Sequence, residues 1–279
     1  MTSLPAATSA SRKSRPQTNL TVLRREELSP HMVRIVAGGD GFSGYVNNDY
    51  IDRYVKIAFP QPGIEYPLPL DLWAIRESMP REQWPHTRTY TVRWVDEEAR
   101  ELAIDFVIHG DEGLAGPWAA KARPGDSLVF TGPGGGYNPD PAADWHLFAG
   151  DEAALPAIAA AIEALPADAR GLAFLEVDSD ADIQPITAPA GLQVQWLARS
   201  GTPAGSSGLL VSAVRDAAWP DGRVQVFAHG ERGYMKSLRQ VFYRERGLDR
   251  AQVSLSGYWA TGRVEDDFQA EKKLPIGQI

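Results

Sequence analysis

The 279-residue chain contains no cysteine. This absence excludes disulfide bonds, thiolate nucleophiles, cysteine zinc sites and iron–sulfur clusters held by the chain's own thiolates. Any redox centre must therefore be bound non-covalently. Histidine is also scarce, with five residues, and their positions include no HxxxH spacing of a helical metal site. We expect no metal bound by the protein itself.

Long hydrophobic runs are absent as well. No apolar stretch approaches the roughly 18 residues that span a bilayer, so we expect no membrane span. Acidic residues outnumber basic ones by 36 to 28, giving a net charge of −8, which argues against a nucleic-acid partner. Residues 1–18 are small, polar and basic without the apolar core of a secretory signal. We therefore expect a disordered tail there, and a cytoplasmic, monomeric protein.

The remaining sequence divides into two parts of different rhythm, which predicts a two-domain β plus α/β protein. Residues 19–138 contain six short runs rich in Val, Ile, Phe and Tyr and one short helical stretch, typical of a six-stranded antiparallel β-barrel. Residues 139–279 alternate strand-like and helix-like runs, typical of a parallel α/β sheet. The boundary falls in the loop 132–144, GPGGGYNPDPAAD, where Gly and Pro leave little room for regular structure.

The first chemical signal is Arg88-Thr89-Tyr90-Thr91, within a predicted barrel strand. An arginine there can bind a diphosphate through two charge-assisted hydrogen bonds. Tyr90 points to the same face of the strand and can cover a planar ring, and Thr91 offers a hydroxyl to the edge of that ring. The alternative is an ordinary exposed strand with an arginine–carboxylate pair.

The second signal is the stretch from Ile108 to Trp118, IHGDEGLAGPW, which runs from a strand end through a glycine-rich turn into a helix. Backbone N–H groups at such a helix start make an anion site suited to a diphosphate. Gly113 and Gly116 would let the backbone approach closely. A simple turn is the alternative, but the two signals followed by an α/β half have the order expected of a ferredoxin-reductase type of flavoenzyme.

At this point the sequence resembles the siderophore-interacting proteins, or ferric-siderophore reductases. The resemblance extends from Leu20 to Asp267 and rests on several motifs in the expected order. These motifs are DRYVK at 52–56, RTYT at 88–91, HGD at 109–111, ARPGD at 122–126 with Gly132-Pro133, AGDE at 149–152 and GYWATGR at 257–263. Three positions depart from the family pattern: Tyr54, Ala153 and Gly134.

The resemblance implies FAD in the barrel, NADPH or NADH as electron donor with ferredoxin as a further candidate, and a ferric siderophore as acceptor. It implies that the cofactor is held by Arg88, Thr89, Tyr90, Thr91, Asp105, His109, Gly110, Gly113, Ala115, Gly116 and Trp118. The nicotinamide nucleotide would lie near Asp151, Glu152, Gly230 and Glu231. The substrate would be held by Lys56, Arg263 and Trp259. No side chain is expected to act as the catalytic acid or base, because the flavin carries the electrons.

Alternatives remain for several of these residues and for the function. Lys56 and Arg263 could form surface salt bridges, and Trp259 could fill the domain interface. Arg199, Arg232 and Arg239 could recognise a 2′-phosphate, although arginines on helices are usually solvated. Besides a ferric-siderophore reductase, the sequence is compatible with a flavin reductase that serves a protein or quinone acceptor. A flavin-free protein that only binds an iron chelate is the third possibility.

Overall fold

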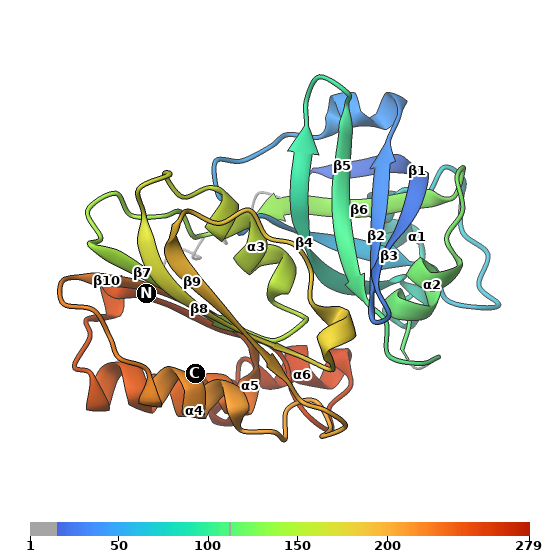
Figure 1. The fold of residues 1–279 in the computed structure, drawn as a ribbon. Helices are drawn as coiled ribbons and strands as arrows, with labels where there is room; N and C mark the ends of the chain where they lie inside the picture. Colours follow the sequence, from blue (N-terminus) through green and yellow to red (C-terminus); the bar gives the residue numbers. More distant parts are fainter. Residues whose placement is uncertain (1–15, 112) are drawn as a thin grey trace, which may run out of the picture.

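The computed structural model describes residues 16–111 and 113–279, which form two domains joined side by side (Figure 1). The fold class predicted from the sequence is confirmed: a closed six-stranded barrel precedes a five-stranded parallel sheet. Residues 1–15 of the predicted tail lie outside the described residues. Strand β1 already begins at Gln17, two residues inside the predicted tail, because Thr18 is buried and pairs with Phe130 on the neighbouring strand.

The barrel strands follow one another in the order β1-β2-β5-β4-β3-β6. Their alternate positions fill the interior with side chains that are at most 1% exposed, among them Val22, Ile35, Ile57, Ile104 and Phe130. The strands are β1 Gln17–Ser29, β2 Met32–Gly38, β3 Tyr54–Phe59, β4 His86–Asp96, β5 Glu101–Val107 and β6 Ser127–Gly134. The helices are α1 Leu72–Ser78 and α2 Ala115–Lys121, with 3-10 turns at Asp40–Gly44 and Arg81–Gln83.

Helix α1 is not evident in the sequence pattern, because it buries only two of its seven residues and no glycine-rich turn precedes it. It forms because the Asp71 carboxylate caps it, accepting hydrogen bonds from the backbone N–H groups of Trp73 and Ala74 at 2.8 and 3.0 Å. Its buried residues Leu72 and Ile75 then pack on the outside of the barrel.

The second domain is a parallel sheet in the order β11-β10-β7-β8-β9. Helix α3 covers the face turned toward the barrel, and α4 and α5 cover the other face (Figure 1). The strands are β7 Trp145–Gly150, β8 Arg170–Val177, β9 Gly191–Ala198, β10 Val224–Glu231 and β11 Val253–Trp259. The helices are α3 Leu155–Glu163, α4 Leu209–Asp216, α5 Arg232–Gln240 and α6 Glu265–Glu271, with short turns at Asp180–Asp182, Val241–Glu245, Arg250–Gln252 and Pro275–Gly277. Within the described ranges, no helix has the length and apolar character that crossing a membrane requires.

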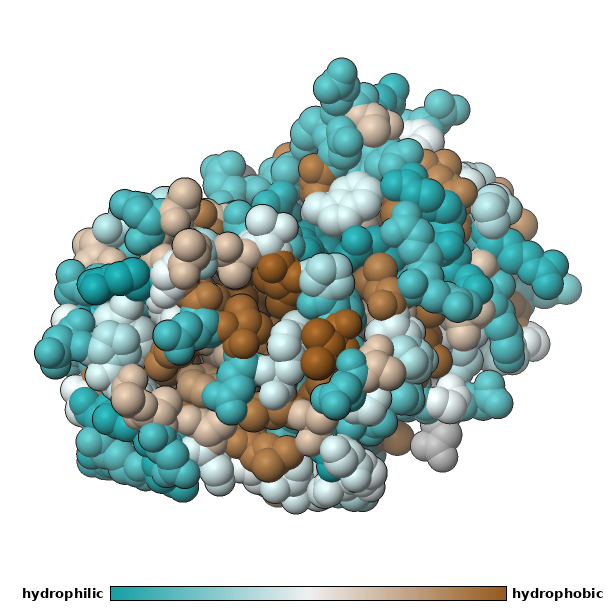
Figure 2. Space-filling view, in the orientation of Figure 1, coloured by the Kyte–Doolittle hydropathy of each residue, from teal (hydrophilic) through white to brown (hydrophobic). Residues whose placement is uncertain are grey.

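The two domains meet along β4, the β1–β2 turn and α3. Arg93 of β4 pairs with Glu163 of α3 at 2.7 Å, and Met32 of the barrel packs into the core beneath α3. A cleft of about 390 Å³ lies at this junction, with Leu155 and Ile186 among its apolar lining residues. In the orientation of Figure 1, Figure 2 shows apolar residues gathered in the middle of the molecule, whereas hydrophilic residues dominate the barrel surface. The relative position of the domains is thus fixed by apolar packing as well as by ion pairs.

Candidate functional site

Strands β4 and β5 diverge at the RTYT motif. They pair from Val92 to Asp96, but before Val92 the residues of β4 pair only with β3. Beyond Ile104 the residues of β5 pair only with β2. The segments 88–91 and 105–109 therefore border the same opening in the barrel wall. Backbone N–H and C=O groups along such a strand edge can hydrogen-bond to a ligand.

Arg88 and Tyr90 lie on one side of β4, at this opening, and exposed Thr89 lies on the other side. The Tyr90 ring packs against Phe106 of β5, with 4.4 Å between ring centroids, so its orientation is fixed. Burial raises the pKa of Tyr90, which stays a neutral phenol. The Arg88 guanidinium forms two hydrogen bonds with Asp266 of α6, at 3.1 and 3.3 Å. Its side chain is only 15% exposed.

The turn from β5 to α2 divides the predicted cradle residues into two groups. Gly110 and Gly113 have positive φ angles of 68° and 83°, and a Cβ added at either would meet no described atom within 4 Å. Exposed His109 lies beside them, whereas Glu112 is outside the described residues. These positions are open to an incoming anion.

The other group packs inward. A Cβ on Gly116 would lie 3.1 Å from the Val107 carbonyl oxygen, so this glycine serves the close packing of α2 on β5. Ala115 belongs to the barrel core, and partly buried Trp118 packs against that core. The ring centroids of Trp118 and Phe106 are 5.6 Å apart. We therefore place only the open end of the turn in the candidate site.

Asp105 does not face the opening. Its carboxylate accepts two hydrogen bonds from Arg34, its cross-strand neighbour on β2, at 2.7 and 2.8 Å. Both residues line the cleft beneath α3. Since both carboxylate oxygens are engaged by one guanidinium, we do not carry Asp105 into the proposed cofactor site.

Helix α6 brings an acidic face against the arginines near the opening. Glu271 pairs with Arg263 at 2.7 Å and also with Arg232, and Asp266 pairs with Arg88. The surface salt bridge considered for Arg263 is thus present in the structure. Sequence reasoning missed this helix, because α6 buries only Phe268 and shows no apolar periodicity.

Lys56 and Lys272 form a second basic feature beside α6. Partial burial lowers the pKa of Lys272, and the positive charge of nearby Lys56 acts in the same direction. Lys56 is exposed on β3. Sequence reasoning also missed Lys272, whose only signal is a lysine pair near the end of the chain.

Asp151 ties together the carboxyl ends of three strands. Its carboxylate accepts hydrogen bonds from the backbone N–H groups of Ala153 and Glu231 at 3.0 and 2.8 Å, and from the Trp259 indole at 2.8 Å. A Cβ on Gly230, whose φ is 148°, would lie 2.7 Å from this carboxylate. Glycine is required at 230 because Asp151 occupies the space.

The pKa of Asp151 provides a test of this arrangement. Burial raises it from 3.8 to about 7. Between pH about 4 and about 7 the unfolded chain has released this proton while the folded chain retains it, so the free energy of unfolding falls as pH rises through this window. Asp151→Asn cannot ionise and should lack this contribution. Urea unfolding of both proteins at about pH 5 and about pH 7.5 should show wild type losing its advantage at the higher pH; parallel profiles would contradict the assignment.

Glu231 and Glu152 are also engaged within the protein. The Glu231 carboxylate caps α5 by accepting from the Tyr234 N–H at 2.9 Å, and it accepts from the Thr261 N–H at 3.1 Å. Glu152 accepts two hydrogen bonds from Arg199 at 2.7 and 2.8 Å. Their contact with a nicotinamide nucleotide stays a prediction.

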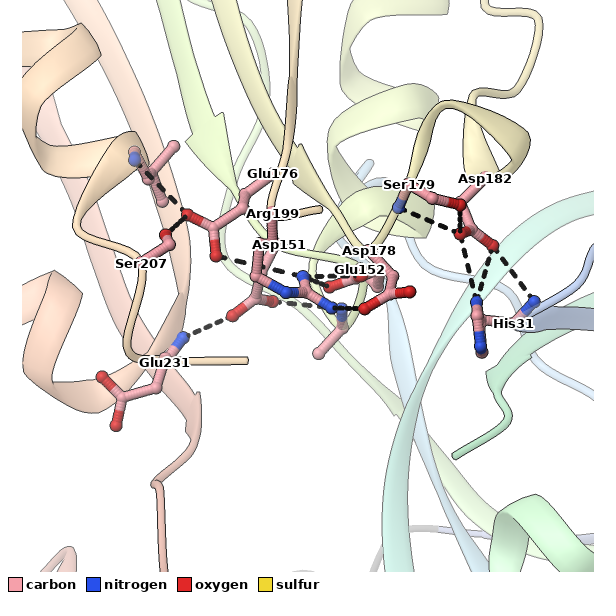
Figure 3. Close-up of polar contacts among 12 residues, drawn as sticks. His31, Asp151, Glu152, Glu176, Asp178, Ser179, Asp182, Arg199, Ser207 and Glu231 are labelled. Carbon is pink, nitrogen blue, oxygen red and sulfur yellow. Dashed lines mark hydrogen bonds and ion pairs between the residues drawn. The ribbon is translucent and has the colours of Figure 1, made fainter. Parts of the chain in front are cut away.

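Arg199 lies at the centre of a cluster of carboxylates, as Figure 3 shows. Besides Glu152, it pairs with Asp178 at 3.2 Å and lies 3.9 Å from Glu176. Arg199 follows β9 and is buried, in contrast to the solvated helical arginine considered from the sequence. Exposed Arg239 is such a residue. The position of Arg199 among three carboxylates argues against its recognising a phosphate.

One group with metal-ligand geometry occurs among the described residues, formed by His31, Asp178 and Asp182. The Asp182 carboxylate already accepts hydrogen bonds from His31 and Ser179 (Figure 3). It also accepts one from the Ser29 hydroxyl. These contacts join the β1–β2 turn to the second domain. We interpret the group as an interdomain contact, because the oxygens of its most buried carboxylate already accept hydrogen bonds from the protein.

The comparisons with known proteins cover both domains. Residues 21–137 match a family model described as siderophore-interacting FAD-binding domain, and residues 143–262 match one described as siderophore-interacting protein. The ferric vibriobactin reductase ViuB of Vibrio cholerae is 33% identical over 93% of this chain and 95% of its own. An NADPH-dependent ferric-chelate reductase of Escherichia coli is 30% identical over 86% of this chain and 91% of its own. The crystal structure of a siderophore utilization protein from T. fusca is 37% identical, with a TM-score of 0.78 over 90% of this chain and 96% of that one.

Proposed function

The chain belongs to the siderophore-interacting protein family, and on that premise we propose that it is an NAD(P)H-dependent flavoenzyme that reduces siderophore-bound iron(III) to iron(II). The observation that carries the proposal is the divergence of β4 and β5. This opening brings Arg88 and Tyr90 to the border of the β5–α2 turn within an FAD-binding domain.

The residues at the opening fit FAD. Arg88 has the planar guanidinium that binds phosphate oxygens in pairs, and the open backbone at Gly110 and Gly113 suits the diphosphate. Tyr90, held by Phe106, offers an aromatic surface for the flavin ring. Bound FAD would take up an electron pair from NAD(P)H and release the electrons singly to iron.

The basic residues beside α6 would hold the iron complex. Siderophore complexes of iron(III) with oxygen donors commonly carry negative charge, and Lys56, Lys272 and Arg263 offer cations around α6, the helix whose Asp266 pairs with Arg88. Iron(II) is the softer ion and binds hard oxygen ligands less strongly than iron(III). Reduction therefore loosens the complex, and these side chains need only bind and orient it.

Nicotinamide would enter over the carboxyl ends of the parallel strands, where α/β sheets bind nucleotides. In this proposal Asp151 and Glu231 act through the backbone, because they hold the Gly230 turn and Thr261 in position. Trp259, fixed by its hydrogen bond to Asp151, would keep water away from the reacting rings.

The test is anaerobic stopped-flow reduction of the FAD-loaded protein with NADPH and with NADH, followed by ferric siderophore, ferredoxin or a quinone in separate runs. The proposal expects flavin bleaching by at least one nucleotide and reoxidation by the siderophore faster than by the quinone. Lys56→Ala should raise the siderophore KM with little change in the nicotinamide reaction. Colourless protein that cannot be reconstituted with FAD would favour the iron-chelate carrier instead.

The pair between Asp266 and Arg88 makes a smaller prediction. FAD phosphate and the Asp266 carboxylate compete for the same guanidinium, so Asp266→Ala should tighten FAD binding. The pair is partly exposed and worth at most about 1 kcal/mol, which corresponds to about a threefold to fivefold lower Kd. Asp267→Ala on the same helix is the control. An unchanged or raised Kd for the Asp266 variant would show that α6 does not compete with FAD.

A further inference from the structure

A chain of four polar side chains crosses from the barrel to the edge strand β11. The Thr91 side chain of β4 lies beside the Tyr258 hydroxyl of β11, within reach of a hydrogen bond. The Tyr258 oxygen lies 3.1 Å from Nδ1 of His229, and Nε2 of His229 lies 2.9 Å from the Ser254 hydroxyl. Thr91 and His229 are buried, whereas Ser254 is half-buried. The chain thus runs from the RTYT motif of β4, which borders the opening, through the interior to half-buried Ser254.

Every link of this chain can point in either direction. Burial lowers the pKa of His229 to about 3, with a further contribution from the Lys272 charge, so the imidazole is neutral. A neutral imidazole has one N–H and one acceptor nitrogen, and the tautomer decides which is which. The other three members are hydroxyls, which both donate and accept. The four side chains can therefore be hydrogen-bonded in two ways. In one, His229 carries its proton on Nδ1, and in the other it carries the proton on Nε2.

We propose that Thr91, Tyr258, His229 and Ser254 form a proton path that removes the proton released when the reduced cofactor gives its electrons to iron(III). The proposal rests on the proposed function. The proton balance of the reaction requires such a path. The reduced cofactor carries two electrons and one ring proton. When it reduces two iron(III) ions, the products are oxidised cofactor, two iron(II) ions and one proton. On the way in, the nicotinamide delivers both electrons and this hydrogen together, so no path is needed.

The transfer balances along the chain. Thr91 accepts the ring proton and passes its own to Tyr258, which passes its own to Nδ1 of His229. His229 then releases the proton on Nε2 to Ser254, and Ser254 gives its proton to water. His229 ends in the opposite tautomer, and no member is left charged. Each hydrogen bond remains made in its reversed direction, which matters because an unpaired buried polar group is costly.

Tyr258→Phe tests the path, because it removes one hydroxyl and keeps the ring. Tyr137→Phe is the matched control: Tyr137 is a buried tyrosine on the same sheet face, and its ring packs on Phe227, which also contacts His229. Stopped-flow traces would follow reduction by NADPH and reoxidation by ferricyanide, a one-electron acceptor. We expect Tyr258→Phe to slow reoxidation at least about tenfold and to leave reduction within about twofold. The control should leave both within about twofold.

Equal slowing of both half-reactions, or of neither, would overturn the proposal. Ferricyanide keeps this test separate from the proposed function. A protein that passes electrons to ferricyanide but not to a ferric siderophore would refute the siderophore substrate. The comparison of Tyr258→Phe with wild type would still test the proton path in that protein. Thermal unfolding and FAD titration of each variant would show whether folding or cofactor binding is affected.

The second measurement does not depend on turnover. In protein with ¹⁵N-labelled histidine, the ring nitrogen shifts of His229 report its tautomer. We expect the proton on Nε2 when the bound flavin is reduced and on Nδ1 when it is oxidised. The same tautomer in both states would show that the chain is a structural hydrogen-bond network only.

Discussion

Replacing Arg88 with alanine is expected to raise the Kd for FAD about 100-fold. The guanidinium offers two charge-assisted hydrogen bonds to a diphosphate, and their loss corresponds to about 3 kcal/mol. The fold should survive, because the Arg88 guanidinium binds Asp266, whose side chain is 60% exposed, and the carbonyl of its own neighbour Thr87. Titration of FAD fluorescence with the protein would measure the Kd directly.

The matched control is Arg93→Ala. Arg93 lies on the same strand, but its guanidinium pairs with Glu163 at the domain interface. Its removal should change the Kd for FAD by less than about threefold while lowering stability slightly. An Arg88→Ala protein that binds FAD as tightly as wild type would remove the basis for the proposed cofactor site.

The largest expected loss of stability comes from Arg199→Met. Methionine matches the length of the arginine stem but leaves Glu152, Glu176 and Asp178 without their shared cation. Removing one member of a buried ion cluster strands the charges that remain, which typically costs about 3–5 kcal/mol. Urea unfolding should show this loss in the free energy of unfolding, with an unchanged m-value.

Arg239→Met is the control for Arg199, because Arg239 is an exposed arginine of α5. It should change the free energy of unfolding by no more than about 0.5 kcal/mol. Adding Glu152→Gln to Arg199→Met should recover part of the loss, because one stranded carboxylate is removed. A stable Arg199→Met protein with weakened binding of NADPH would instead assign Arg199 to the nucleotide.

The structure places two groups of predicted site residues in different surroundings. Arg88, Tyr90, Gly110 and Gly113 lie at the opening between β4 and β5, as expected of a cofactor cradle. The carboxylates predicted near the nicotinamide accept hydrogen bonds from the protein, and their contact with the nucleotide stays a prediction. A strand motif fixes local direction, whereas the Glu231 N–H that binds Asp151 lies 80 positions away in the sequence and the Arg199 that binds Glu152 lies 47 positions away.

Local sequence determined the strand and helix order, the two-domain division and the position of the RTYT motif, because alternation and turn residues act over a few positions. Helices α1 and α6 were not predicted, since each has seven residues and little apolar periodicity, whereas the equally short α2 follows a recognisable glycine-rich turn. Only the tertiary structure decided that α6 brings Asp266 to Arg88, and that Tyr258 joins Thr91 to His229 across the domain interface. Such pairs depend on how two domains pack, and packing is set by the summed burial of many residues rather than by any one motif.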